Sequence, residues 1–267
     1  METKALSSSL GVEISGIDDL LDDVVIARCV EALKWRGVLL LRGADLDDET
    51  QITLSRKFGD VVTFGGREIF KVSLDPSVNP AAEYLKGTFN WHIDGTTDPV
   101  PIKATMLSAR QVAMVGGGTE FASTYAAYEN LPDKEKERID NLTVVHSLEA
   151  SQRALNPNPT DEQIAQWRSV PSQEVPLVWR RRDGRCSLVI GTTADHIVGL
   201  SADESRALLD ELRDWSTQER FVYTHEWQVG DLVMWDNTGM LHRALPYDAS
   251  SRRTMHRTTI FGDEAFK

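Results

Sequence analysis

"GDLVMWDNTGMLHRALPYD", residues 230–248, reads as an apolar strand, a turn at Asp236-Asn237 and a second strand that begins near His242. The same pattern of short strands separated by turns continues along the chain from residue 100 onward. Further strands are expected at residues 103–110, 119–125, 176–181, 186–191, 220–227 and 254–262, with a hairpin turn at Asp183-Gly184. Because these strands do not alternate regularly with helices, the pattern favours a sandwich or jelly roll over a doubly wound sheet.

Helices are expected outside and between these strands. Helical spacing over residues 24–36 ends at Gly37, a buried strand follows at 38–43, and a second helix over 47–58 ends at Gly59. Two more helices are expected around residues 132–142 and 201–215. The sequence therefore predicts a mainly β fold with N-terminal and inserted helices.

The chain has 267 residues and no linker or internal repeat that would divide it, so a single domain spanning 1–267 is expected. Residues 64–87 have weak periodicity and several turn formers, which is typical of a long loop. Segments at about 60–90 and 150–175 are expected to be variable loops, lids or inserts.

Composition narrows the class of protein. A net charge of −12 opposes binding to phosphate backbones and argues against a nucleic-acid partner. No segment approaches the length of a membrane span, and the N-terminus lacks a signal-like apolar block, so a cytoplasmic protein without a membrane partner is expected. Cys29 and Cys186 are expected to be buried thiols.

A possible metal site begins at "FNWHIDGTTDPVP", residues 89–101. On an extended segment, His92 and Asp94 face the same way and can approach one ion, although a polar turn is the better explanation of this short motif taken alone. His242 adds a second histidine. Two histidines and one carboxylate form the facial set that leaves positions on Fe(II) open for a chelating co-substrate and oxygen, whereas zinc also accepts these ligand types.

Two arginines near the C-terminus favour the oxygenase interpretation. Arg253 and Arg257 are four residues apart and would share one face of a strand, while Arg252 would point to solvent. An inward guanidinium requires an anion, because burying an unpaired charge is costly, and its planar fork suits a carboxylate. Two inward arginines beside a metal therefore indicate two anionic groups.

The combined pattern resembles the TauD/TfdA family of Fe(II)- and 2-oxoglutarate-dependent dioxygenases. The resemblance rests on His92-Ile93-Asp94, Gly117-Gly118-Thr119, "WDN" before His242, and the two arginines. The segments "MLSAR", "GGTEFASTYAAYENLP" and "LHRALPYD" are most similar to the 2,4-dichlorophenoxyacetate dioxygenase branch. This resemblance implies a double-stranded β-helix, a cupin-like jelly roll.

The resemblance also implies roles for individual residues. His92, Asp94 and His242 would hold Fe(II), and Thr119 with Arg253 would hold the distal carboxylate of 2-oxoglutarate, with O₂ as the oxidant. Arg257 would receive an anionic group of a small substrate. The further pocket candidates are Phe89, Asn90 and Thr97. Succinate and CO₂ would be released as the substrate is oxidised.

Alternatives remain open at this level. The leading substrate class is an aryloxyalkanoate or related carboxylate, and the alternative is an amino-acid-like acid in a biosynthetic pathway. A non-catalytic jelly-roll binding protein would keep the fold without the chemistry. Trp91 and Trp235 would line the pocket or fill the core, a homo-oligomer is possible, and structural or surface roles are expected for the other histidines, His146, His196, His225 and His256.

Overall fold

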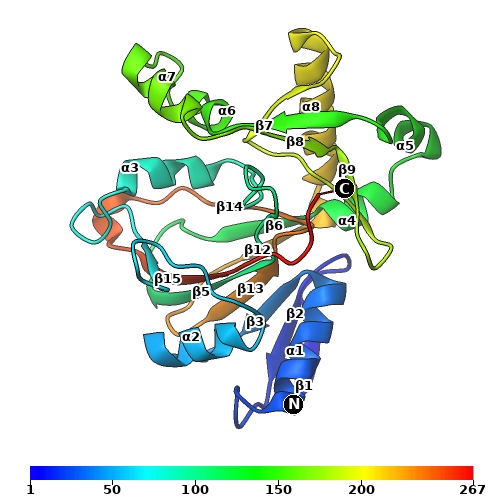
Figure 1. The fold of residues 1–267 in the computed structure, drawn as a ribbon. Helices are drawn as coiled ribbons and strands as arrows, with labels where there is room; N and C mark the ends of the chain where they lie inside the picture. Colours follow the sequence, from blue (N-terminus) through cyan, green and yellow to red (C-terminus); the bar gives the residue numbers. More distant parts are fainter. Residues whose placement is uncertain (267) are drawn as a thin grey trace.

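The computed structural model describes residues 1–266 and is organised around two sheets that face each other (Figure 1). The larger sheet has the order β1 (Glu2–Ala5), β2 (Val12–Ser15), β3 (Val38–Leu41), β13 (Leu232–Asp236), β5 (Ala104–Gln111), β15 (Thr254–Ile260), β4 (Phe70–Val72). The smaller sheet has the order β12 (Val222–His225), β6 (Thr119–Ser123), β14 (Met240–Ala244). This arrangement confirms the predicted jelly roll with helices.

Strand β13 is apolar along its length because both of its faces are buried. Leu232 and Met234 pack under the N-terminal helices α1 (Asp23–Arg36) and α2 (Asp48–Arg56). Val233 and Trp235 point between the two sheets and contact residues of the smaller one. A strand buried on both faces loses the polar alternation of a half-exposed strand. The run "LVMW" therefore marks the centre of the larger sheet.

The N-terminal helices follow their predicted boundaries closely. The Asp22 side chain accepts hydrogen bonds from the first turn of α1, and Gly37 ends the helix with φ of +69°. Asp47 caps α2 in the same way. Both helices lie against the larger sheet on the side away from the smaller one (Figure 1).

A third layer covers the smaller sheet. It contains β7 (Thr143–His146), β8 (Gln173–Pro176) and β11 (Ala194–Ile197) as one sheet, and the hairpin β9 (Val178–Arg180)/β10 (Cys186–Leu188). The helices of this layer are α4 (Thr124–Glu129), α5 (Asp133–Ile139), α6 (Leu148–Arg153), α7 (Asp161–Arg168) and α8 (Ala202–Ser216). Gly184 adopts φ of +84° in the β9–β10 turn, which confirms the predicted hairpin.

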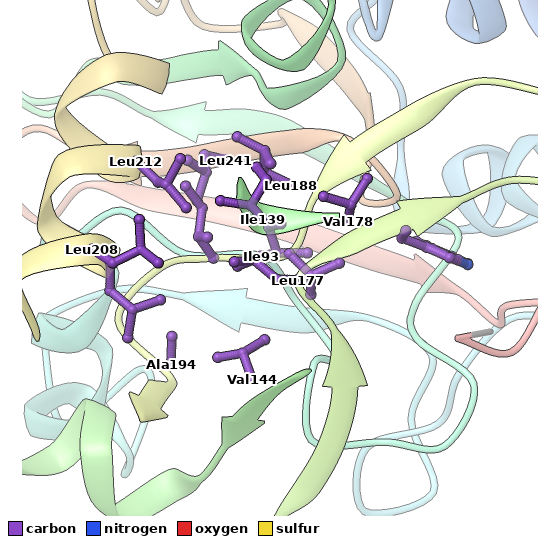
Figure 2. Packing of buried hydrophobic residues seen from close by; sticks show 14 of the residues in the cluster. Ile93, Ile139, Val144, Leu177, Val178, Leu188, Ala194, Leu208, Leu212 and Leu241 are labelled. Atoms are coloured by element: carbon purple, nitrogen blue, oxygen red, sulfur yellow. The ribbon is translucent and has the colours of Figure 1, made fainter. Parts of the chain in front are cut away.

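The core of this layer anchors the segments that carry the proposed ligands. Ile93 lies between His92 and Asp94, and Leu241 precedes His242; both pack with Leu208, Leu212 and their neighbours (Figure 2). Ile93 is 5% exposed and Leu241 is fully buried. Burial of these two side chains fixes the backbone on either side of the site.

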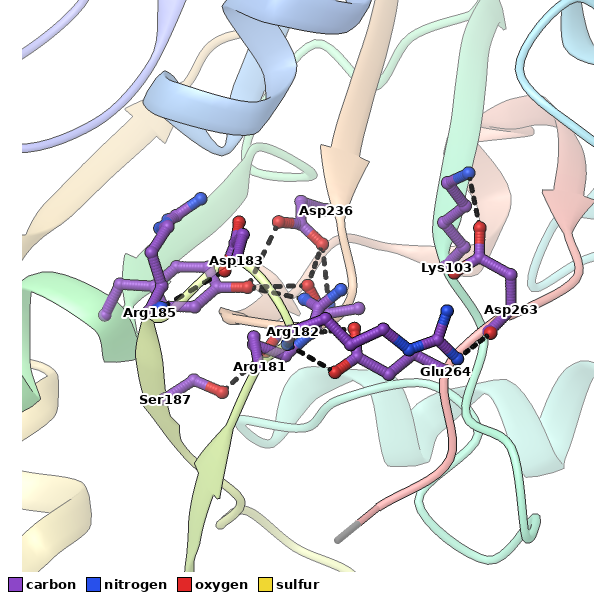
Figure 3. Close-up of polar contacts among 11 residues, drawn as sticks. Lys103, Arg181, Arg182, Asp183, Arg185, Ser187, Asp236, Asp263 and Glu264 are labelled. Atoms are coloured by element: carbon purple, nitrogen blue, oxygen red, sulfur yellow. Dashed lines mark hydrogen bonds and ion pairs between the residues drawn. The ribbon is translucent and has the colours of Figure 1, made fainter.

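A polar network holds the turn between β13 and β14 (Figure 3). The Tyr125 hydroxyl is 2.7 Å from Thr238 Oγ1, and Arg181 donates to that hydroxyl at 2.8 Å. Arg181 also pairs with Glu264 at 2.9 Å, and Asp236 accepts hydrogen bonds from Thr238. The network therefore joins the β9–β10 hairpin and the C-terminal segment to the turn that leads into His242.

The structure contains elements for which none was predicted, among them α4, α6, α7, β1, β2, β7 and β11. It also differs from the prediction at residues 64–87 and at Cys186. Residues 64–87, predicted as a loop, contain β4 paired with β15 and the helix α3 (Ala82–Leu85), followed by the 3-10 helix η1 (Lys86–Phe89). Strand β4 is held by backbone pairing at a sheet edge, which leaves little pattern in so short a segment. Cys186 is half-buried, contrary to prediction, whereas Cys29 is buried and its thiol pKa is raised to about 11 by burial. Two short 3-10 helices, η2 (Glu219–Phe221) and η3 (Ala249–Ser251), complete the described elements.

Candidate active site

His92, Asp94 and His242 come together at one edge of the smaller sheet. Their potential ligand atoms all lie within 4.8 Å of one another. His92 donates its backbone N–H to the carbonyl of His242 at 3.1 Å, and His242 donates back at 2.9 Å. The Asp94 carboxylate is 3.8 Å from Nε2 of each histidine. A loop residue and a strand residue are thus held in register by two backbone hydrogen bonds.

Hydrogen bonds at Nδ1 determine which histidine nitrogen faces the shared space. His92 Nδ1 lies 2.9 Å from the carbonyl oxygen of Asn90, and His242 Nδ1 lies 3.4 Å from that of Met240. A carbonyl oxygen only accepts, so each Nδ1 carries a proton, and in the neutral form of either ring Nε2 presents a lone pair. Burial, together with the neighbouring His92, lowers the pKa of His242 to about 3, which keeps this ring neutral. Neutral imidazoles are the form that binds metal.

Asp94 is oriented by a chain of side chains from the "WDN" motif. Trp235 Nε1–H donates to Asn237 Oδ1 at 3.0 Å, and Asn237 donates to Thr105 Oγ1 at 2.8 Å. Thr105 in turn donates to Asp94 Oδ2 at 3.4 Å. Burial raises the pKa of Asp94, but His242, Arg257 and His92 outweigh burial and the net pKa is lowered. The carboxylate is therefore ionised beside the two imidazoles, a donor set that fits a divalent cation.

Arg253 is 2% exposed and lies at the start of the last strand. Its guanidinium lies over the Tyr247 ring at 4.9 Å, and its Nε has no hydrogen-bond partner among residues 1–266. Gly117, at φ of +72°, lies directly beside it, where an added Cβ would be 3.0 Å from Arg253 Cδ. A buried cation with an unsatisfied donor fits an anion such as a carboxylate.

Thr119 is buried on β6 and accepts a hydrogen bond from Trp227 Nε1 at 2.9 Å. Its own O–H is therefore available to donate to another acceptor. Gly117 lies two residues earlier, so β6 begins beside Arg253. Thr119 on β6 and Arg253, directly before β15, thus offer hydrogen-bond donors from the two sheets.

A cavity of about 450 Å³ opens beside His92 and Asp94. Arg257 lines it, with its guanidinium 3.9 Å from Asp94 Oδ2 and over the rings of Phe70 and Phe64 at 4.8 and 5.3 Å. Arg257 Nε has no partner in the described chain. Aromatic walls around a cation favour a ligand that combines an anionic group with an apolar body.

The three other residues predicted to line the substrate pocket lie in different places. Thr97 lines this cavity, whereas Phe89 and Asn90 are not among its lining residues. Phe89, at the end of η1, packs edge-on against Tyr247, and Asn90 borders a neighbouring cavity.

The tryptophans and remaining histidines have contacts of their own. Trp91 and Trp235 are buried in hydrophobic clusters, with the Trp235 ring 4.8 Å from that of His242. His146 and His225 are fully buried, His196 is exposed beside Asp195, and His256 turns to Asp48 on α2. As predicted from strand parity, His256 faces away from Arg253 and Arg257.

Sequence reasoning gave no role to Trp227, Thr105 or Tyr247. Trp227 and Thr105 act through hydrogen bonds to residues distant in the chain, and such pairs leave no local periodicity. Tyr247 lies in the quoted segment "LHRALPYD", but only the fold places its ring against Arg253. The sequence indicates only that each proposed ligand needs a buried polar partner. It does not indicate which residue supplies that partner.

Comparisons with known proteins agree with this geometry. A model of the family described as "Taurine catabolism dioxygenase TauD, TfdA family" matches residues 2–259. The alpha-ketoglutarate-dependent 2,4-dichlorophenoxyacetate dioxygenase of Cupriavidus pinatubonensis is 35% identical, covering 95% of this chain and 94% of that protein. Pentalenolactone F synthase of Streptomyces arenae is 36% identical, covering 92% and 89%.

Solved structures agree as well. The crystal structure of AAD-2 in complex with Mn(II) and N-oxalylglycine has a TM-score of 0.86 and 32% identity, covering 100% of this chain and 99% of that one. Among residues 1–266, no helix has the length and apolar character needed to cross a membrane. The family model spans nearly the whole chain, and the protein belongs to the TauD/TfdA family of Fe(II)- and 2-oxoglutarate-dependent dioxygenases.

Proposed function

We propose that this dioxygenase oxidises a small carboxylate that binds through Arg257, with an aryloxyalkanoate or related acid as the leading substrate class. The observation that carries the proposal is the position of Arg257 in the cavity, 3.9 Å from Asp94 and flanked by two phenylalanine rings. The 35% identity to a 2,4-dichlorophenoxyacetate dioxygenase supports the same class.

In this proposal His92, Asp94 and His242 hold Fe(II). Their Nε2 atoms and ionised carboxylate fit that ion, and the hydrogen bonds at Nδ1 favour the tautomer that binds metal through Nε2. Arg253 and Thr119 hold the distal carboxylate of 2-oxoglutarate, which would satisfy the unpartnered Nε of Arg253. When bound, Fe(II), 2-oxoglutarate and O₂ supply the oxidising chemistry, with succinate and CO₂ as co-products.

The protein's own residues supply position and exclusion of water. Arg257 fixes the acid group of the substrate, so the neighbouring carbon is directed toward the proposed metal site. Residues from both variable segments line the cavity: Phe64, Phe70, Tyr84 and Leu85 from the first, and Ser151 and Gln152 from the second. We propose that these segments act as lids within a single domain of residues 1–267.

A second candidate is a biosynthetic tailoring oxygenase that hydroxylates or desaturates an amino-acid-like acid. The 36% identity to a pentalenolactone F synthase favours this alternative. Both candidates place an anion on Arg257 and differ only in the body of the substrate. We further propose a cytoplasmic location and a homo-oligomer, the latter to be checked by light scattering at several concentrations.

The test is succinate formation from 2-oxoglutarate by anaerobically Fe(II)-loaded protein after oxygen is admitted. A panel of aryloxyacetates, arylpropionates, sulfonates and amino acids is compared in wild type and Arg257→Gln. Stimulation by a carboxylate that is lost in Arg257→Gln supports the proposal. Stimulation that survives the substitution would place the acid group elsewhere.

A further inference from the structure

His146 anchors a hydrogen-bond chain that reaches the substrate cavity. The side chain is fully buried at the end of β7, with Nε2 3.2 Å from the Val189 carbonyl oxygen and Nδ1 2.8 Å from Thr193 Oγ1. Thr193 Oγ1 lies 2.8 Å from Thr96 Oγ1. Thr96 and Thr193 both line the cavity that contains His92, Asp94 and Arg257.

His146, at the buried end of this series of hydrogen bonds, fixes which partner donates in each of them. The Val189 carbonyl only accepts, so His146 Nε2 carries the proton. Burial lowers the pKa of His146 to about 4, so the ring is neutral near pH 7 and Nδ1 is an acceptor. Thr193 therefore donates its single hydroxyl proton to Nδ1. Thr96 must then donate its proton to Thr193.

The two threonines consequently have no proton left for a ligand. A hydroxyl group has one donor and two acceptor lone pairs, and the donor of each is used inside the protein. One lone pair of Thr193 accepts from Thr96, and the remaining lone pairs have no hydrogen-bond partner within residues 1–266. A substrate group that only accepts hydrogen bonds would therefore find no donor on either threonine.

We infer that Thr96 and Thr193 form an acceptor-only subsite that selects substrates with an N–H or O–H group, in addition to the carboxylate on Arg257. The inference rests on the proposed function, because it assumes that the substrate occupies this cavity. It makes the two threonines substrate-positioning residues, with His146 acting through Thr193. The preferred acid therefore carries an amino, amide or hydroxyl donor beside its apolar body.

The size of the effect follows from a single neutral hydrogen bond. Such a bond contributes about 0.5–1.5 kcal/mol, so a donor-bearing ligand should bind roughly 2- to 10-fold more tightly than a matched ligand without the donor. Thr193→Val keeps the shape of the side chain but releases the Thr96 proton. Thr96 would then donate toward the cavity, and the preference should disappear or reverse.

The experiment compares ligands that differ by one donor. Phenoxyacetate is paired with N-phenylglycine, in which N–H replaces the ether oxygen, and with 2-, 3- and 4-hydroxyphenoxyacetate. Binding is measured by calorimetry on protein loaded with Mn(II) and N-oxalylglycine, in wild type, Thr193→Val and the control Thr193→Ser. We expect at least one donor-bearing member to bind more tightly in wild type and Thr193→Ser, and to lose that advantage in Thr193→Val.

Equal binding of all pairs, or an advantage that survives Thr193→Val, would overturn the subsite while leaving Arg257-dependent carboxylate binding intact. If no carboxylate binds, the proposed function fails, and the subsite is then judged by nitrogen-15 NMR of His146. An Nε2–H tautomer between pH 6 and 8 upholds its acceptor character. A proton on Nδ1 would free the threonine protons and overturn it.

Discussion

Trp227 donates its indole N–H to Thr119 Oγ1 at 2.9 Å, and both side chains are buried. The bond occupies one lone pair of the hydroxyl and turns the Thr119 proton away from the indole. The Thr119 proton is therefore free to reach another acceptor, and Thr119 follows two residues after Gly117, which lies beside Arg253. Trp227 therefore influences the proposed co-substrate site through Thr119, and the proposal assigns Trp227 no direct contact with the co-substrate.

Trp227→Phe should therefore weaken 2-oxoglutarate binding roughly 2- to 10-fold, the effect of one hydrogen bond. Pyruvate has the same oxo acid without the distal carboxylate and serves as the control ligand. Calorimetry on Mn(II)-loaded protein should show the loss for 2-oxoglutarate alone. An equal loss for both ligands would mean that the substitution disturbs the metal site instead.

Gly117 tests the packing around Arg253. Gly117→Ala places a Cβ 3.0 Å from Arg253 Cδ at φ of +72°, so it should shift the guanidinium and weaken 2-oxoglutarate binding. Gly184→Ala is the matched control, because Gly184 has φ of +84° and nothing within 4 Å of the added Cβ. Both variants should lose about 1 kcal/mol of stability from backbone strain. Unchanged 2-oxoglutarate affinity in Gly117→Ala would argue against Arg253 as its anchor.

The two phenylalanines beside Arg257 should contribute to binding of the substrate and not to binding of the co-substrate. Phe70→Leu removes a ring 4.8 Å from the guanidinium and should raise the KM of the carboxylate substrate about 2- to 5-fold, as expected for a cation–π contact. Phe261→Leu, at a half-exposed position, is the control. Steady-state kinetics should show the change in the KM of the substrate with that of 2-oxoglutarate constant. A rise in both KM values would contradict this division.

The lowered pKa of His146 predicts that the metal-free protein becomes less stable in acid. Its pKa is about 4 when folded, owing to burial, against about 6.5 when unfolded, so the unfolded chain binds the proton more tightly. Stability is therefore complete above about pH 6.5 and falls as the pH drops toward 4, by about 3 kcal/mol in total. His146→Gln removes this contribution, although His242 still titrates. Urea unfolding at pH 7 and pH 5 should show a smaller pH effect in the variant; an identical pH effect would show that His146 is protonated when folded.

The sequence predicted those parts of the fold in which local pattern and tertiary environment agree. The apolar run of β13, the helix end at Gly37 and the turn at Gly184 carry strong local signals, and each lies where predicted. The three proposed ligands and two arginines could be selected because few residue types bind metals or carboxylates. Strand β4 and the roles of Trp227 and Thr105 could not, since they depend on partners far away in the chain.

The most direct test of the central claim is metal binding by the His92–Asp94–His242 cluster. Calorimetry with Mn(II) should give one ion per chain in wild type, and an affinity at least about tenfold weaker in His92→Ala, Asp94→Ala and His242→Ala, because even indirect supports of a metal site cost that much. His196→Ala, at an exposed site, should bind like wild type. Undiminished binding in the three ligand variants would contradict the account and move the metal to other residues.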